Sequence, residues 1–394
     1  MIADKMKPLV ENNSAIRLMF EEGKKMAALY GEENVYDFSL GNPNVPSPPA
    51  VNEAICRIIK EEKSTFVHGY MSNAGYDDVR ETVAGSLNRR FGTHFHKENL
   101  IMVTGAASGM NVILKTILDP GDEVIVFAPY FMEYNSYVRN YDGVVTIVPP
   151  DKSSFQPDLN AFEDKITEKT KAVIINSPNN PAGVVYSAQT LKEIASILEK
   201  KEKELGRSIV LISDEPYREL VYDGAEVPYV TPFYRNTVVC YSYSKTLSLP
   251  GERIGYLVIP DELEASGAVI TAAVIANRVL GCVNAPSLMQ RVVMRCVDEK
   301  VDLEAYDRNR KLLYSSLLEY GFECVKPEGA FYLFLKTPGE EQEFCRVCKE
   351  HRVLVVPGSS FACPGYVRIA YCVSYEQIER SLPAFKEIAE VYGL

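Results

Sequence analysis

The chain has 394 residues, of which 46% are hydrophobic and 24% charged, a composition that is typical of a globular protein with a sizeable apolar core. Its 42 basic residues are outnumbered by 53 acidic ones, and the net charge of −11 argues against general nucleic-acid binding, which depends on clustered Lys and Arg. No apolar run is long enough to span a membrane, and residues 1–13 lack the apolar segment of a signal peptide.

Seven short apolar runs, each closed by turn residues, predict strands through the middle of the chain. Several of these runs are continuously apolar rather than alternating, which is typical of strands buried on both faces. Helical patterns such as 109–118 and 190–204 lie between many of them, and this alternation predicts an α/β fold with a mostly parallel, seven-stranded sheet flanked by helices. The expected strands are residues 101–103, 124–127, 144–148, 172–175, 209–212, 238–241 and 254–259.

The C-terminal third has a different pattern. A long amphipathic stretch over about 288–320 is followed by short strands and a closing helix, which suggests a smaller α+β domain. The proline-rich segment 42–49 cannot be regular helix and marks a connection. We therefore expect a large domain over 46–287, and a small domain with an N-terminal arm made of 1–45 and 288–394. Its short strands are predicted at 331–335, 354–356 and 367–370, and its closing helix at about 376–391.

The most informative segment is 241–255, where Lys245 follows an apolar strand among small hydroxyl residues. A lysine amine forms a Schiff base with an aldehyde cofactor if burial or neighbouring cations lower its pKa. Ser242, Ser244 and Arg253 supply the hydroxyls and the guanidinium that would hold a phosphate dianion nearby. Lysines at strand ends are common on protein surfaces, so the combination, and not Lys245 alone, indicates a cofactor site.

Asp214 ends another predicted strand, at the position where ligands bind in open α/β sheets. A buried carboxylate needs a cationic partner, and the protonated nitrogen of a pyridine ring would be one. Keeping that nitrogen protonated makes the ring an electron sink. Tyr217 and Asn180, which follow neighbouring strands, could both reach a phenolic oxygen on such a ring. A helix N-cap at Asp214 and a plain Asn/Pro turn around Asn180 remain the alternatives.

A loop of small residues follows the strand at 101–103 and opens a helix. Free backbone N–H groups and the helix dipole make such a turn a phosphate cradle, which here lies within residues 103–109. By itself the signal is weak, because small residues are common at tight turns between a strand and a helix.

Together and in chain order, these segments resemble the class I and II aminotransferases, the fold-type I pyridoxal-phosphate family that includes aspartate aminotransferase. The SxSKxxxxxGxRxG signature of that family is matched at 242–255, its NPxG at 180–183 and its DExY at 214–217. The resemblance covers essentially the whole chain. It implies an enzyme that uses pyridoxal 5′-phosphate to move an amino group from an L-amino acid to a 2-oxo acid by a ping-pong mechanism.

The resemblance also implies a role for each matched residue. Lys245 would form the internal aldimine and shuttle the proton, and Asp214 would pair with the pyridinium nitrogen. Asn180 and Tyr217 would bond the O3′ oxygen of the ring, while Arg368, with Asn180 and the backbone of Gly41, would bind the substrate carboxylate. The remaining cofactor contacts would come from Tyr70, Ala106, Ala107, Ser108, Phe131, Ser242, Ser244 and Arg253.

Tyr70 resembles the tyrosine that members of this family lend to the phosphate of the neighbouring subunit, which implies a homodimer with shared active sites. The chain departs from the family pattern in its Ala-Ala-Ser phosphate loop and in Phe131, where many members carry Trp or Tyr. Arg278 lies near the arginine that dicarboxylate-specific members supply from the partner subunit, but its spacing differs. The amino donor therefore stays open.

Three other functions can be compared with that of an aminotransferase. A fold-type I C–S β-lyase, or a related synthase, would use almost the same cofactor residues and would release pyruvate and ammonia. A cofactor-sensing regulator would need a separate DNA-binding domain, for which the pattern leaves no room, and a purely structural protein would not need these residues together at the sheet ends.

Nine cysteines are spread along the chain, and in the absence of an export signal we expect reduced thiols in a cytoplasmic protein. Cys345 and Cys348 form a CxxC pair without a second pair beside it, so we expect two thiols on one helix face and no metal site.

Overall fold

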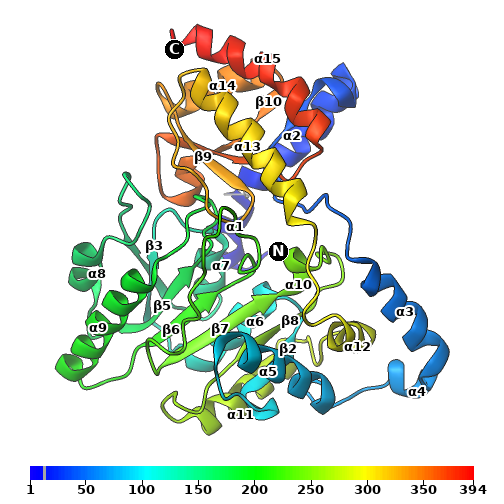
Figure 1. Ribbon diagram of the computed structural model, residues 1–394. Coiled ribbons are helices and arrows are strands. Elements are labelled where there is room, and N and C mark those ends of the chain that lie inside the picture. Colours follow the sequence, from blue (N-terminus) through cyan, green and yellow to red (C-terminus); the bar gives the residue numbers. More distant parts are fainter. Residues whose placement is uncertain (12–14) are drawn as a thin grey trace.

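A seven-stranded sheet forms the centre of the lower, wider part of the molecule in Figure 1. The computed structural model describes residues 1–11 and 15–394. The strand order is β2-β8-β7-β6-β5-β3-β4; β8 is antiparallel to both neighbours, and the other strands share one direction. The strands are β2 (Leu100–Val103), β3 (Glu123–Phe127), β4 (Val144–Val148), β5 (Thr170–Asn176), β6 (Val210–Asp214), β7 (Thr237–Ser242) and β8 (Gly255–Val258).

Different helices cover the two faces of this sheet, because successive side chains of a strand point to opposite sides. Val124 and Val126 lie in one apolar cluster with residues of α6 (Ala106–Ile117), α7 (Glu133–Arg139) and α11 (Ser266–Val279). Ile125 and Phe127 lie in a second cluster with residues of α8 (Leu159–Lys165) and α9 (Ala188–Leu205). A third cluster joins β2 and β8 to α3 (Pro49–Glu61), α4 (Ser64–Val67), α5 (Asp77–Phe91) and α12 (Ser287–Arg295).

Local sequence signals set the ends of these helices. The Ser187 side chain accepts a hydrogen bond from the Thr190 backbone N–H and so caps the start of α9. Gly206 ends the same helix with a φ of +65°, the left-handed conformation that glycine adopts without strain. Gly92 ends α5 in the same way.

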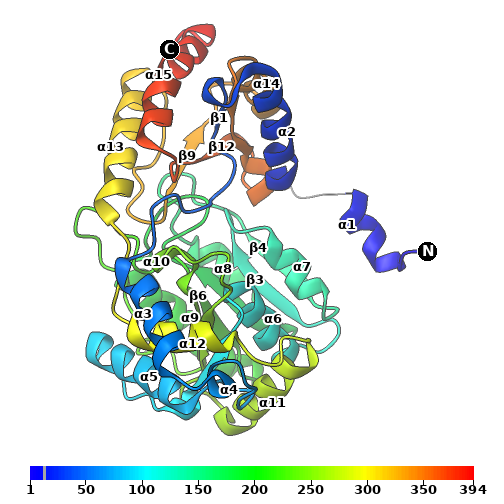
Figure 2. The same cartoon turned by 90° about the vertical axis from the view of Figure 1, so that its right-hand side faces the viewer.

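The upper part of the molecule combines a small antiparallel sheet, in the order β11-β12-β9, with the C-terminal helices (Figure 1). In addition, β1 (Tyr36–Asp37) pairs in parallel with β10 (Val353–Leu354), so a segment near the N-terminus joins this part. Figure 2 shows α2 (Ala15–Tyr30) beside it, whereas α1 (Lys7–Glu11) stands away from the body. The remaining elements are β9 (Tyr332–Lys336), β11 (Val356–Pro357), β12 (Tyr366–Ala370), α13 (Leu303–Glu319), α14 (Glu341–Glu350) and α15 (Tyr375–Val391).

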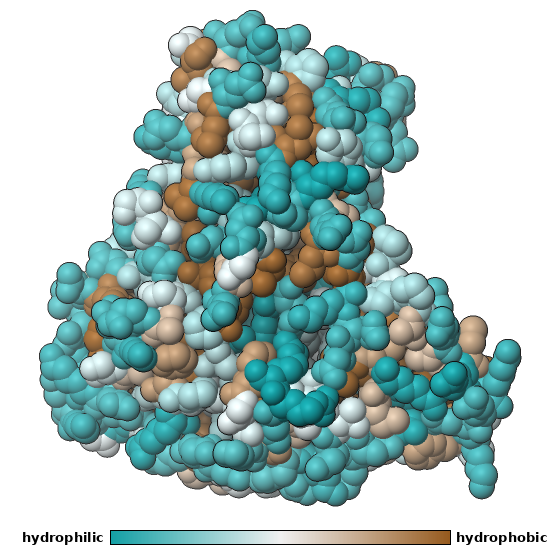
Figure 3. Space-filling model, in the orientation of Figure 1, coloured by the Kyte–Doolittle hydropathy of each residue, from teal (hydrophilic) through white to brown (hydrophobic). Residues whose placement is uncertain are grey.

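Phe38 fastens the N-terminal segment to the upper part. Its side chain is fully buried, and its ring centroid lies 5.8 Å from that of Phe385 in α15. Its backbone N–H donates to the Leu354 carbonyl, and its own carbonyl accepts from the Ala370 N–H. Figure 3 shows apolar surface gathered where the upper and lower parts meet. The domain boundaries at 46 and 287 stay a prediction.

The predicted fold class, an α/β protein with a mostly parallel seven-stranded sheet, is confirmed. The amphipathic stretch over 288–320 consists of two helices, α12 and α13, and residues 296–302 separate them. The second helix begins where the Asp302 side chain accepts from the Glu304 N–H. Among the residues described, no helix combines the length and the apolar character that crossing a membrane would require.

We expect Phe38→Ala to lower the free energy of unfolding by about 3–5 kcal/mol, because the truncation leaves a cavity in a closely packed core. Chemical denaturation followed by circular dichroism measures this change. Leu318→Ala on α13 is the control, since Leu318 is 42% exposed and its truncation should change stability by no more than about 0.5 kcal/mol. Equal effects of the two substitutions would contradict the anchoring role of Phe38.

Candidate active site

Most of the predicted site residues meet at one edge of the seven-stranded sheet. Asn176 at the end of β5 pairs in register with Asp214 at the end of β6, which pairs with Cys240 near the end of β7. Because β8 runs the opposite way, its first residue, Gly255, lies opposite Ser242 of β7 and Val103 of β2. Strand ends that are far apart in the sequence therefore become neighbours.

Lys245 lies in the short helix α10 (Tyr243–Thr246), directly after β7. Its Nζ donates to the Gly41 carbonyl oxygen at 2.9 Å. Burial, together with the positive charges of Arg253 and Arg368, lowers the pKa of Lys245 to about 8. A Cβ atom at Gly41 would lie 2.1 Å from the Tyr332 hydroxyl, so only glycine fits where the backbone meets this lysine.

Asp214 is buried, and burial raises the pKa of its carboxyl group to about 7. Its Oδ2 accepts a hydrogen bond from the Tyr134 hydroxyl at 2.5 Å. Its Oδ1 is also buried and has no hydrogen-bond partner among the described residues. The backbone of Asp214 is held by the Asn176 side chain, whose Nδ2 donates to the Asp214 carbonyl at 2.9 Å. A buried carboxylate oxygen without a donor is a place for a cationic or N–H group of a ligand.

A cradle for an anion lies at the N-terminus of α6. Gly105 precedes the helix with a φ of +83°, and a Cβ atom there would lie 2.7 Å from Nη2 of Arg253. The Arg253 side chain donates to the Thr104 carbonyl at 3.3 Å and reaches the Ser244 hydroxyl at 3.5 Å. The hydroxyls of Ser242 and Ser244 are 2.8 Å apart. Ala106, Ala107 and Ser108 form the first turn of the helix, whose free N–H groups favour a phosphate.

Arg368 on β12 brings a buried guanidinium to the same edge. Its Nη2 donates to the Ser39 carbonyl at 2.6 Å, and its Nη1 donates to Asn180 Oδ1 at 3.0 Å. Its Nε has no partner among the described residues. The guanidinium lies over the Tyr332 ring at 4.5 Å from the centroid. A buried arginine with a free donor is suited to a carboxylate.

Aromatic side chains complete the site. The hydroxyls of Tyr217 and Tyr332 are 2.8 Å apart, so one donates to the other. The Phe131 ring is half-buried and meets the Tyr134 ring edge to face, with centroids 5.8 Å apart. The tyrosine pair lies beside Arg368, and Tyr134 lies beside Asp214. These rings form apolar walls around the few charged groups of the site.

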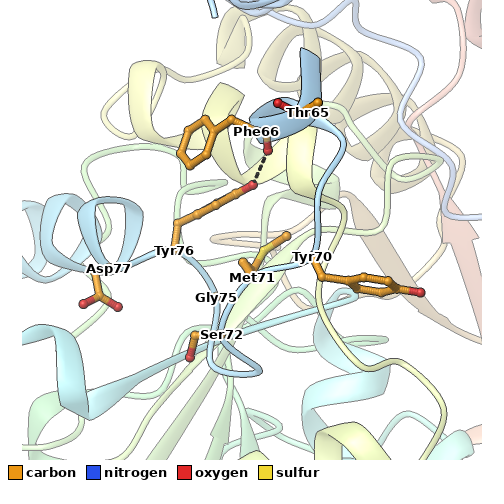
Figure 4. A pocket seen from close by; sticks show the side chains of 8 residues that line it. All are labelled: Thr65, Phe66, Tyr70, Met71, Ser72, Gly75, Tyr76 and Asp77. Carbon is orange, nitrogen blue, oxygen red and sulfur yellow. Dashed lines mark hydrogen bonds between the residues drawn. The ribbon is translucent and has the colours of Figure 1, made fainter. Parts of the chain in front are cut away.

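Tyr70 does not join the other predicted residues within one chain. Its side chain is 93% exposed, at the rim of a pocket beside α4 that it lines together with Phe66, Met71 and Tyr76 (Figure 4). Arg278 is exposed at the end of α11. A tyrosine that is so exposed contributes to an active site only if a second chain approaches it.

The CxxC pair lies on one helix, α14. Burial raises the pKa of the Cys345 thiol to about 12 and that of Cys348 well above its usual value, so neither is a reactive thiolate at neutral pH. In the part of the chain that the structure describes, no group of His, Cys, Asp and Glu side chains is arranged to hold a metal ion.

Three residues of the site were missed by the sequence analysis: Tyr134, Asn176 and Tyr332. Asn176 opens the segment that contains Asn180, and its Oδ1 accepts from the Asn180 N–H at 2.7 Å. Its position at the end of a predicted strand could have indicated this role. Tyr134 and Tyr332 carry no local signal, because their contacts with Asp214 and Tyr217 join segments at least 80 residues apart.

The family comparison agrees with this geometry. The family model described as "Aminotransferase class I and II" matches residues 33–385. The chain belongs to the class I and II aminotransferases. The aspartate aminotransferase of Thermotoga maritima is 32% identical over 372 residues, which cover 93% of this chain and 94% of the relative. The aspartate/prephenate aminotransferase of Thermus thermophilus is 32% identical over 356 residues and covers 89% of this chain and 90% of its own.

Solved aminotransferase structures have the same fold. An aminotransferase from Eubacterium rectale matches with a TM-score of 0.98 and 47% identity over 100% of both chains. The Thermus thermophilus aspartate aminotransferase with maleate has a TM-score of 0.84 and 28% identity, covering 96% of this chain and 97% of its own. The chain is therefore an aminotransferase, and the predicted family and enzyme class are confirmed.

The cofactor of this family is pyridoxal phosphate, and the residues present fit that group. The unpartnered Oδ1 of Asp214 suits the N–H of a protonated pyridine ring, and the cradle at α6 suits a phosphate. Lys245 would offer an amine with a pKa near 8 to the aldehyde. No comparison favours the C–S lyase alternative.

We expect Asp214→Asn to stabilise the cofactor-free protein at about pH 8 but not at about pH 4. Burial raises the pKa of Asp214 from 3.8 to about 7. An ionised carboxylate is costly to bury, so the free energy of unfolding falls as the pH rises from about 4 to about 7. Urea denaturation of both proteins across the range measures the difference. The amide can still accept from Tyr134, so a stability difference that does not depend on pH would contradict the assignment.

Proposed function

We propose that this aminotransferase is a cytoplasmic homodimer in which Lys245, Asp214 and Tyr217 carry the chemistry. One observation supports this most directly. An amine with a pKa near 8, a buried carboxylate oxygen without a donor and a buried guanidinium with a free N–H lie at one edge of one sheet. Groups that burial has shifted in this way, and that lie together, are typical of active sites.

The proposed cofactor site uses residues from five loops of one chain and one loop of its partner. Asp214 would meet the ring nitrogen, Asn180 and Tyr217 would bond the ring oxygen, and Phe131 would cover the ring face. The phosphate would be held by Tyr70 of the partner subunit together with Ala106, Ala107, Ser108, Ser242, Ser244 and Arg253. When bound, pyridoxal phosphate supplies an electron-withdrawing ring that stabilises the electron pair left by the departing α-proton.

The residues of the chain would bind and orient the amino acid. Arg368 would hold its α-carboxylate through two N–H groups, with Asn180 and the backbone of Gly41 beside it, and this grip fixes the direction of the Cα–H bond. Lys245 would take the α-proton in its neutral form. With a pKa of about 8, roughly one tenth of this amine is neutral at about pH 7, whereas an ordinary lysine would be almost fully charged.

The homodimer is proposed from Tyr70 and from an apolar surface. The Tyr70 side chain is almost completely exposed, and Ile275, Val279 and Leu280 at the end of α11 are exposed apolar side chains. A symmetric partner that covered these residues would bring its own Tyr70 toward the cradle at α6. We propose with it the division into a large domain, 46–287, and a small domain made of 1–45 and 288–394.

The donor is proposed from the relatives, whose names include aspartate, aspartate/prephenate and aromatic-amino-acid aminotransferases. Aspartate is therefore the first donor to test, and aromatic amino acids come next. Arg278 of the partner subunit is the candidate for a second carboxylate, because it is exposed on the same helix as the apolar residues named above.

A single-turnover titration tests the function. The holoenzyme is mixed with single L-amino acids without any oxo acid, while the cofactor absorption and the products are followed. We expect conversion of the cofactor to its amine form with one equivalent of 2-oxo acid, fastest for the natural donor. Continuous release of pyruvate and ammonia, with the absorption unchanged, would identify a lyase and overturn the proposal.

We expect Lys245→Ala to lower turnover by about 10²–10⁴-fold or more, because it removes the proposed general base. Borohydride reduction of the wild-type enzyme should add the cofactor mass to the peptide that contains Lys245. Mass spectrometry of the variant should find no such addition. Near-normal turnover by the variant would refute the role of this lysine.

We expect Tyr70→Phe to weaken cofactor binding by about tenfold or more, because one charge-assisted hydrogen bond to the phosphate is lost. Equilibrium dialysis of the cofactor measures this change, and sedimentation gives the oligomeric state. Tyr30→Phe is the control, since Tyr30 is also exposed and lies on α2. An active monomer, or a Tyr70→Phe variant with unchanged cofactor affinity, would contradict the shared site.

A further inference from the structure

Tyr134 lies beneath the proposed cofactor site, in the first turn of α7. Its hydroxyl donates to Asp214 Oδ2 at 2.5 Å, and both side chains are buried. We propose that Tyr134 is a positioning residue, which keeps Asp214 ionised and turns its free oxygen, Oδ1, toward the ring nitrogen of the cofactor. This inference rests on the proposed role of Asp214.

The hydrogen bond has one possible direction. Burial raises the pKa of the Tyr134 phenol well above its usual value, so the phenol keeps its proton and donates it. The acceptor is a carboxylate that burial alone would drive to its neutral form. A donor bonded to a carboxylate stabilises the charged form, and such charge-assisted bonds are short. The phenol therefore opposes the effect of burial on Asp214.

No other side chain of the described residues does the same for Asp214. Glu215, the next residue, is engaged by buried Arg218 and by the Ser213 hydroxyl. The Cys240 thiol donates to the Ala106 carbonyl. Tyr137 faces Asp214 from the next turn of α7 without a hydrogen bond to it. Oδ1 has no hydrogen-bond partner in the part of the chain that the structure describes, so Tyr134 fixes which carboxylate oxygen stays free.

Neighbouring residues hold both partners of this hydrogen bond in place. The ring of Tyr134 is stacked with that of Tyr130 at a centroid distance of 6.4 Å and meets Phe131 edge to face at 5.8 Å. The backbone of Asp214 is fixed by Asn176 on the neighbouring strand. These contacts hold the carboxylate with Tyr134 on Oδ2, so Oδ1 is the oxygen left for a ligand.

The chemical consequence concerns the ring nitrogen. A carboxylate there stabilises the protonated pyridine, and a protonated ring withdraws electrons more strongly. Without the Tyr134 hydroxyl, Asp214 becomes more basic and takes the proton for itself. The ring then withdraws electrons less strongly, so removal of the α-proton slows while the Arg368 contact with the substrate is unchanged. The expected result is a loss in kcat with little change in KM.

The test uses holoenzyme that carries cofactor labelled with ¹⁵N at the ring nitrogen. We expect the nitrogen resonance of Tyr134→Phe to move from the protonated toward the unprotonated position. Because a hydrogen bond to a charged group is lost, we also expect weaker cofactor binding and a kcat lower by roughly ten- to a hundredfold. KM should change by less than about twofold.

Tyr234→Phe is the matched control. Tyr234 is buried in the cluster around α9, and its hydroxyl donates to the Ile209 carbonyl at 2.7 Å. Its substitution also removes one buried hydrogen bond but should leave the nitrogen resonance, kcat and KM unchanged. If both variants alter kcat equally, with the nitrogen resonance unmoved, the effect of Tyr134 is merely structural and the proposal fails.

The variant removes one oxygen atom and keeps the ring, so we expect it to fold. If too little folded protein is obtained, 4-aminophenylalanine at position 134 keeps the shape and a weaker donor, and the resonance should then move part of the way. An unmoved resonance would overturn the proposal. Failure of the proposed function is distinguishable, because it would appear as normal turnover by Lys245→Ala or as lyase products from the wild-type enzyme.

Discussion

The common direction of the strands is the constraint on which the site depends. In this sheet β5, β6 and β7 end side by side, so Asn180, Asp214 and Lys245 follow neighbouring strand ends. The reversed strand β8 begins at that same edge, which brings Arg253 beside the N-terminus of α6. A parallel β8 would place Arg253 at the opposite edge of the sheet. The proposed phosphate and ring contacts therefore follow from strand direction before any side chain is considered.

Burial then gives these residues their chemical character. It moves the pKa of Lys245 down to about 8 and that of Asp214 up to about 7, because a low dielectric disfavours both charges. The amine becomes a usable base, and the carboxylate becomes a strong partner for a cation. Tyr134 counteracts part of this effect at Asp214 by donating to it. The same burial destabilises the cofactor-free fold, so reactivity and stability oppose each other here.

Much of the architecture could be predicted from local pattern. Short apolar runs identified all seven strands, and several of these runs are continuously apolar because a strand covered on both faces has no polar side. Asp214 ends β6, and Lys245, Asn180 and Arg253 lie within four residues of a strand end, while their roles in the site stay a prediction. Tyr134 and Tyr332 were not found, because nothing in the adjacent sequence marks a hydroxyl whose partner is distant in the chain. Asn176 was also missed, although its place after a predicted strand was a usable signal. The sequence also did not show that residues 296–302 divide the stretch 288–320 into two helices.

The sequence by itself determined the order of strands and helices, the family resemblance and the residue types of the site, since these depend on periodicity and on short motifs. The tertiary structure decided which atoms remain free. Across residues 1–11 and 15–394, Tyr134 donates to Oδ2 of Asp214 and no group donates to Oδ1. Gly41 must be glycine because the Tyr332 hydroxyl occupies the space of a side chain. Such facts depend on packing between segments that are distant in the chain, and packing exists only once the chain has folded.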